Sequence, residues 1–155
     1  MWVYKTGRSE EKKMVLYQFE NDRKYDRASD YLEGFNGVIQ SDGYQAYANI
    51  KDIKNMGCFA HIRRKLVEVM DVAPHTPKKS HLDTAMTYAI NNEKYLRYYI
   101  EDGRVEISNN SAERCCKSFV IGRKNFLFSN SINGAKASGA AYSIIESAKI
   151  NGLKP

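Results

Sequence analysis

The stretch Val38-Ile39-Gln40-Ser41-Asp42-Gly43-Tyr44 decides the fold of this chain. Val and Ile favour a half-buried strand, and an Asp-Gly pair ends it. An acid at the carboxyl end of a strand lies where open α/β sheets carry their chemistry. A lone Asp before Gly also serves as a simple turn former, and that alternative stays open for Asp42.

A second acid of interest, Glu113, lies in Ser108-Asn109-Asn110-Ser111-Ala112-Glu113-Arg114. The spacing from Asn110 to Glu113 resembles a capping box, so a structural role at the start of a helix is the alternative. A strand-end Asp and a helical Glu brought to one sheet edge can bind Mg²⁺ or Mn²⁺, which prefer oxygen ligands. Such ions activate a water or a hydroxyl for attack on a phosphodiester.

Composition narrows the class of protein. A chain of 155 residues predicts one domain, and the net charge of +6 fits an anionic partner such as nucleic acid. Three cysteines without disulfide spacing favour a reducing cytoplasm. No apolar run reaches membrane-spanning length, so we expect no membrane partner.

The remaining elements follow from hydrophobic spacing and turn residues. The first half predicts a hairpin, a short helix and a right-handed parallel βαβ unit. These elements cover residues 2–19, residues 28–35 and residues 38–60. The second half predicts amphipathic helices at 62–70, 82–100 and 134–151, a linker at 73–79, and an extended segment at 119–128 with a basic turn at 122–125.

Basic side chains gather near both acids. Each one read alone is a solvated surface cation, but their density between residues 114 and 124 favours a phosphate-binding track. The candidates for DNA binding are Arg63, Arg64, Lys65, Arg114, Lys117, Arg123 and Lys124.

Cys58 and His61 have the spacing of half a zinc site. No second pair completes such a site, so we expect Cys58 in the core. His61 follows the predicted strand at 54–60 and is a candidate for the edge of the acidic site. Cys115 and Cys116 have no evident paired base, which argues against a nucleophile.

Six blocks, taken together and in this order, resemble the transposases of the IS66 family of bacterial insertion sequences. The resemblance covers nearly the whole chain, although no single block is decisive. The blocks are Met1-Trp2-Val3-Tyr4-Lys5-Thr6-Gly7-Arg8, Gln40-Ser41-Asp42-Gly43-Tyr44, Gly57-Cys58-Phe59-Ala60-His61-Ile62-Arg63-Arg64-Lys65, Asn109-Asn110-Ser111-Ala112-Glu113-Arg114, Gly122-Arg123-Lys124-Asn125-Phe126-Leu127-Phe128 and residues 142–152.

The resemblance implies an α/β, RNase H-like catalytic core with an Asp-Asp-Glu triad that binds Mg²⁺ or Mn²⁺. Asp42 matches the second acid of the triad and Glu113 the third. The implied activity is phosphodiester hydrolysis and strand transfer at transposon ends. The implied partners are transposon-end and target DNA, with full-length transposase or self-association as further partners. The implied location is the bacterial cytoplasm, at the nucleoid.

The chain departs from the family in two places. The resemblance implies that the family's first Asp lies on a strand upstream of the block at residues 1–8, and we expect this chain to start after it. We therefore expect a partial domain without its first central strand, divided into a sheet half at 1–73 and a helical half at 80–155. We also expect little or no strand transfer from this chain alone.

The second departure is a missing helical insertion between the two acids, at Pro74 to Lys79. Two rival hypotheses follow from these losses. One is a catalytically inactive remnant that acts as a basic module binding DNA or transposase. The other is a pseudogene product without a selected role.

Overall fold

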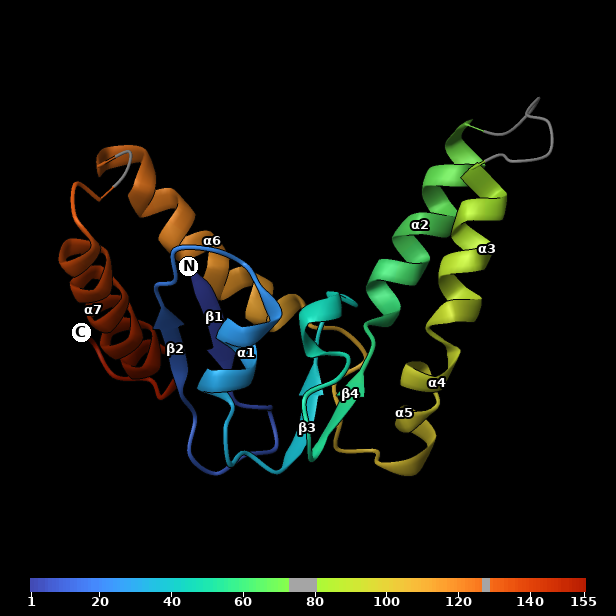
Figure 1. The fold of residues 1–155 in the computed structure, drawn as a ribbon, viewed down its shortest axis with the longest axis horizontal. Coiled ribbons are helices and arrows are strands. Elements are labelled where there is room, and N and C mark those ends of the chain that lie inside the picture. The colour runs from blue at the N-terminus through green and yellow to red at the C-terminus, as the bar shows by residue number, and fades with distance from the viewer. Residues whose placement is uncertain (73–80, 127–128) are drawn as a thin grey trace. The chain divides into compact units, whose positions relative to one another are not determined.

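A computed structural model describes residues 1–72, 81–126 and 129–155 of the chain. The described residues form a mixed α/β structure with two compact units (Figure 1). The first unit contains Met1–Arg23, Arg104–Glu106 and Asn110–Pro155, and the second contains Lys24–Gly103 and Ile107–Asn109. The predicted linker at 73–79 lies outside the described residues.

The first unit begins with the predicted hairpin, which the structure confirms. Strands β1 (Trp2–Lys5) and β2 (Val15–Gln18) pair antiparallel, with Val3 opposite Tyr17. Alternate residues of β2 are buried, as expected for a strand with one face against a core.

Helix α7 (Ile132–Ile150) closes the outer edge of β2. Ser147 Oγ accepts a hydrogen bond from the Val15 amide at 2.9 Å, and Ser143 Oγ accepts one from the Tyr17 amide at 2.8 Å. The helix can come this close because Gly139 has no side chain. A Cβ at that position would lie only 2.9 Å from the Tyr17 carbonyl oxygen. Helix side chains thus form hydrogen bonds with backbone amides at an edge of β2 that could otherwise pair with another strand.

Helix α6 (Asn110–Phe126) packs against β1 and completes the core of this unit. Val15, Tyr17 and Cys115 are buried together, with Phe119 and Tyr142 packed against them. The Tyr17 hydroxyl donates to the Cys115 carbonyl at 2.6 Å.

The predicted extended segment at 119–128 is wrong as far as Phe126, because α6 continues to that residue. Cys115 and Phe119 are one helical turn apart and both face Tyr17, and this packing outweighs the turn signal of the residues at 122–125. The last two residues of the predicted segment lie outside the described chain.

The second unit contains the predicted parallel pair. Strands β3 (Gly37–Gln40) and β4 (Ile53–Met56) align in parallel, with Gly37 opposite Ile53 and Gln40 opposite Met56. The short 3₁₀ helix η1 (Gln45–Tyr47) lies between these strands in the chain. It contacts helix α1 (Tyr25–Tyr31), which precedes β3. The strand predicted to reach residue 60 ends at Met56.

The other helices of this unit follow β4. Helices α2 (Phe59–Val72) and α3 (His81–Asn91) pack side by side. The single helix predicted over 82–100 breaks at Asn92, whose side chain donates to the Tyr88 carbonyl at 2.7 Å beside its own backbone amide at 3.2 Å. Two short helices follow, α4 (Glu93–Leu96) and α5 (Tyr98–Glu101).

Each sheet has two strands within the described residues. The described residues are mixed α/β with small sheets, and the RNase H-like arrangement and the halves at 1–73 and 80–155 stay predictions. In the described part of the chain, no helix combines the length and the hydrophobicity needed to cross a lipid bilayer.

Candidate functional site

Asp42 lies two residues beyond the carboxyl end of β3, as predicted. The Ser41 amide still pairs with the Met56 carbonyl at 3.0 Å, and the chain then turns. The Tyr44 amide donates to Asp42 Oδ1 at 3.1 Å, and the Gly43 amide donates to Ser41 Oγ at 3.2 Å. The turn-forming role is therefore real, and the exposed carboxylate keeps its second oxygen accessible to a ligand.

Helix α3 holds this turn from the side. The Tyr88 hydroxyl donates to the Asp42 carbonyl at 2.9 Å. Gly43 has φ +88°, and a Cβ there would lie 3.2 Å from Tyr88 Oη and 3.4 Å from Asn92 Oδ1. Burial raises the pKa of Tyr88, and the nearby charge of Asp42 raises it further, so the hydroxyl remains a donor at neutral pH.

The carboxyl end of β4 is fixed to the end of β3 by Tyr99. Its hydroxyl accepts a hydrogen bond from Gln40 Nε2 at 2.7 Å and lies 2.8 Å from the Gly57 carbonyl and 3.0 Å from the Ile107 carbonyl. Burial raises the pKa of Tyr99 to about 12. Local sequence patterns indicate neither Tyr88 nor Tyr99, because each contacts partners more than 40 positions earlier in the chain.

The chain segment that leads into α6 is also anchored at the end of β4. Cys58 is buried, as predicted, and its Sγ accepts a hydrogen bond from the Asn109 amide at 3.4 Å and lies 3.9 Å from Ser108 Oγ. The Phe59 amide donates to the Ile107 carbonyl at 3.1 Å. Three consecutive residues before α6 are thereby held beside the strand that neighbours β3.

His61 does not lie at a strand end. Because β4 stops at Met56 and α2 begins at Phe59, His61 lies in the first turn of α2, and its amide donates to the Cys58 carbonyl at 3.2 Å. The strand prediction failed here because a helix starts where the apolar run continues. A role for His61 at the edge of the acidic site stays a prediction.

Glu113 lies in the first turn of α6 and is half-buried. An acid in this position is favoured by the helix dipole, so the structural reading as a helix-start residue also stands. Glu113 belongs to the first unit and Asp42 to the second. Within the described residues, no cluster of three or more His, Cys, Asp or Glu side chains could hold a metal ion.

The basic side chains predicted to bind DNA lie on two helices, and those on α6 lie on more than one face of that helix. Arg63, Arg64 and Lys65 are exposed on α2, in the second unit. On α6, at about 100° per residue, Lys117 and Lys124 share the face of Glu113, and Arg114 flanks it.

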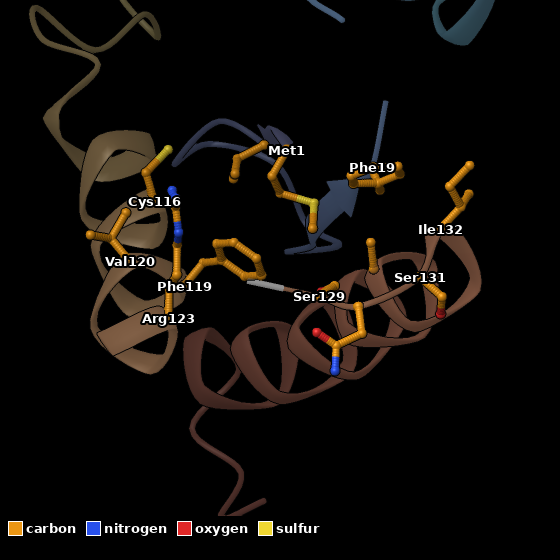
Figure 2. A pocket seen from close by; sticks show the side chains of 12 residues that line it. Met1, Phe19, Cys116, Phe119, Val120, Arg123, Ser129, Ser131 and Ile132 are labelled. Atoms are coloured by element: carbon orange, nitrogen blue, oxygen red, sulfur yellow. The ribbon is translucent and has the colours of Figure 1, made fainter. Parts of the chain in front are cut away.

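Arg123 lies about 100° from Lys124 around the axis of α6. It is exposed and, like Cys116, lines a cavity (Figure 2). By this geometry Lys117 and Lys124 lie on the face of Glu113, and Arg114 and Arg123 lie on its two opposite sides.

That cavity, of about 610 Å³, lies within the first unit between the hairpin, α6 and the start of α7. Its lining is mainly apolar and includes Met1, Phe19 and Phe119. Hydrophobic spacing gave no sign of the cavity, because its walls come from segments far apart in the sequence.

Comparison with known proteins places the chain in a family. The sequence model described as "Transposase IS66 family" matches residues 1–79 and 68–137. The two matches overlap at residues 68–79, the region where the sequence predicts a lost insertion.

Three relatives from Sinorhizobium fredii (strain NBRC 101917 / NGR234) are all named as uncharacterized proteins. Protein y4qI is 26% identical over 205 residues, which include 92% of this chain and 38% of y4qI. Protein y4jD is also 26% identical, with 91% of this chain and 40% of y4jD aligned. Protein y4hP is 21% identical, with 91% and 39%.

The chain therefore spans about two fifths of the length of these relatives. The aligned region is longer than this 155-residue chain, so the relatives contain internal residues that it lacks. No solved structure matches the chain. With the family match extending over residues 1–137, the chain belongs to the IS66 family of transposases.

Proposed function

We propose that this chain contributes two acids, Asp42 and Glu113, to the metal-binding site of an Asp-Asp-Glu transposase with an RNase H-like core. The observation that carries this proposal is the Asp42 turn. An exposed carboxylate follows a parallel strand, and a backbone amide fixes one of its oxygens. A carboxylate oriented in this way suits a metal ligand, since ligating carboxylates are themselves hydrogen-bonded.

The donor set fits Mg²⁺ or Mn²⁺. These hard cations bind through one or two carboxylates and fill the remaining positions with water and phosphate oxygens. The bound ion would supply an activated hydroxyl nucleophile and stabilise the leaving oxygen of a phosphodiester. The protein's own contribution is to hold the carboxylates of Asp42 and Glu113 toward the ion and to exclude competing geometries.

Family membership supports the inclusion of Glu113, because the IS66 family match covers both acids. Glu113 belongs to the first unit and Asp42 to the second. Within the second unit, Cys58 and Phe59 hold the segment Ile107–Asn109 by hydrogen bonds beside the carboxyl end of β4.

The face of α6 that carries Glu113 also carries Lys117 and Lys124. Cations next to a metal-binding acid suit the negative phosphates of a DNA strand. We propose that these two lysines and Arg114 bind phosphates of transposon-end or target DNA.

Mn²⁺ titration of the 155-residue chain, followed by water-proton relaxation, tests the metal site. We expect Asp42→Asn and Glu113→Gln each to weaken Mn²⁺ binding at least about ten-fold. Asp26→Asn, an exposed acid on α1, is the matched control and should bind like the wild type. Equal Mn²⁺ affinity in all four proteins would contradict the proposal.

A second candidate function is a basic module that binds DNA or a longer transposase without cutting. The net charge of +6 and the basic face of α6 favour it. It predicts that Asp42→Ala and Glu113→Ala bind a DNA duplex as well as or better than the wild type, with no effect of Mg²⁺. Fluorescence anisotropy with and without Mg²⁺ separates the two functions, because a metal-bridged complex gains affinity with Mg²⁺ and loses that gain in both variants.

A further inference from the structure

The turn that presents Asp42 is not held by its own backbone. Gly43 has φ +88°, and a glycine can leave that conformation easily because no Cβ restricts it. The two hydrogen bonds inside the turn involve exposed groups, for which water competes. An external contact is therefore needed to keep the carboxylate in one orientation.

Tyr88 supplies that contact. Its hydroxyl lies 2.9 Å from the Asp42 carbonyl, and it fills the space where a side chain on Gly43 would be. Because the carbonyl of Asp42 belongs to the peptide plane that ends in the Gly43 amide, a bond to this carbonyl fixes the plane next to the carboxylate. The Tyr44 amide that binds Asp42 Oδ1 follows by one residue.

Tyr88 is itself held in place. Asn92 Nδ2 donates to the Tyr88 carbonyl at 2.7 Å, at the point where α3 ends. The Asn92 amide donates to the same carbonyl at 3.2 Å. The end of α3 is thus a fixed support, from which one phenol reaches the Asp42 turn.

We propose that Tyr88 is a positioning residue for Asp42, whose hydroxyl holds the Asp42 turn so that the free carboxylate oxygen points toward a bound divalent cation. The inference rests on the proposed function, because it takes Asp42 as a metal ligand. Nothing in the family match or in the names of the relatives assigns a role to Tyr88.

The test compares Tyr88→Phe with the matched control Tyr98→Phe. Both variants lose one tyrosine hydroxyl in the second unit, but Tyr98 lies on α5, where its ring lies under Lys54. The first readout is amide hydrogen exchange at Gly43 and Tyr44 by NMR. We expect Tyr88→Phe to speed exchange there about ten-fold, the effect of losing one net hydrogen bond, while Tyr98→Phe leaves those amides unchanged.

The second readout is Mn²⁺ affinity of the same proteins, with Asp42→Asn beside them. We expect Tyr88→Phe to weaken Mn²⁺ binding several-fold, less than Asp42→Asn, with the melting temperature within a few degrees of the Tyr98→Phe control. Removal of a group that orients a metal ligand has an effect of this kind.

The two readouts separate the failure of each idea. Unchanged exchange at Gly43 and Tyr44 in Tyr88→Phe overturns the positioning role, whatever Mn²⁺ does. Faster exchange with Mn²⁺ binding that only Asp42→Asn weakens overturns the link between Tyr88 and the ion. Mn²⁺ binding that is unchanged even in Asp42→Asn overturns the proposed function and, with it, the metal-directed part of this inference.

Discussion

Single residues decide how the strand ends of the second unit are fixed. Asp42 could be predicted from its neighbours, because a β-branched run followed by Asp-Gly is a local pattern. Tyr88 and Tyr99 could not, since their hydroxyls reach partners 46 and 42 positions away in the chain. Local sequence does not indicate such distant contacts. Nothing in the sequence shows which of the eleven tyrosines make them.

The contribution of the Tyr99 hydroxyl to stability can be tested by changing the pH. Burial raises the pKa of Tyr99 in the folded chain from its ordinary value of 10 to about 12, so the folded state keeps the proton where the unfolded state has lost it. Its contribution to stability is therefore complete below pH 10 and is lost as the pH rises toward 12. We expect the difference in free energy of unfolding between wild type and Tyr99→Phe to be constant near neutral pH and to shrink between pH 10 and 12.

Urea unfolding of both proteins across that range measures this difference. The subtraction removes the lysines and the other tyrosines, which titrate in both chains. A difference that stays constant up to pH 12 would mean that the Tyr99 hydroxyl ionises as readily in the folded chain as in the unfolded one.

At the scale of elements, local patterns predicted the hairpin, the parallel pair and α7 within a few residues. They failed for α6, where Gly122 and Asn125 indicated a turn. The helix continues because Cys115 and Phe119 pack against Tyr17, which is 98 positions from Cys115. They failed again at Asn92, where the predicted single helix gives way to two short helices after α3.

The contact between α7 and β2 is an element-scale feature that a substitution can test. Ser147 Oγ accepts from the Val15 amide and donates to the Val15 carbonyl at 3.1 Å, and Val15 is fully buried. Ser147→Ala leaves both backbone groups without this partner, so we expect a loss of about 1–3 kcal/mol of unfolding free energy and faster exchange of the Val15 amide.

Ser118→Ala on α6 is the control, since Ser118 is half-buried without a role at the β2 edge. It should change stability by no more than about 0.5 kcal/mol. Equal losses in the two variants, by chemical denaturation, would show that the serine hydroxyl of α7 does not close the edge of β2.

At the scale of the whole molecule, the sequence predicted the family and the basic charge. It could not predict the division into two units, because they interleave along the chain and exchange short segments near residues 104–109. For the same reason, no local pattern relates Asp42 to Glu113. The acidic pair remains a proposal supported by family membership.

The net charge of +6 alone predicts that any lost cation weakens DNA binding to the same degree. The structure predicts a difference between two neighbours on α6. Both side chains are exposed, but Lys124 shares a helix face with Lys117 and Glu113, whereas Arg123 lines the cavity with Cys116 (Figure 2). If Lys124 contacts a phosphate, Lys124→Gln lowers the slope of log affinity against log salt by about 0.9, and Arg123→Gln leaves the slope nearly unchanged.

Anisotropy titrations of one duplex at several salt concentrations measure both slopes. Identical slopes for the two variants would mean that DNA responds to total charge, and the phosphate track on α6 would have to be abandoned.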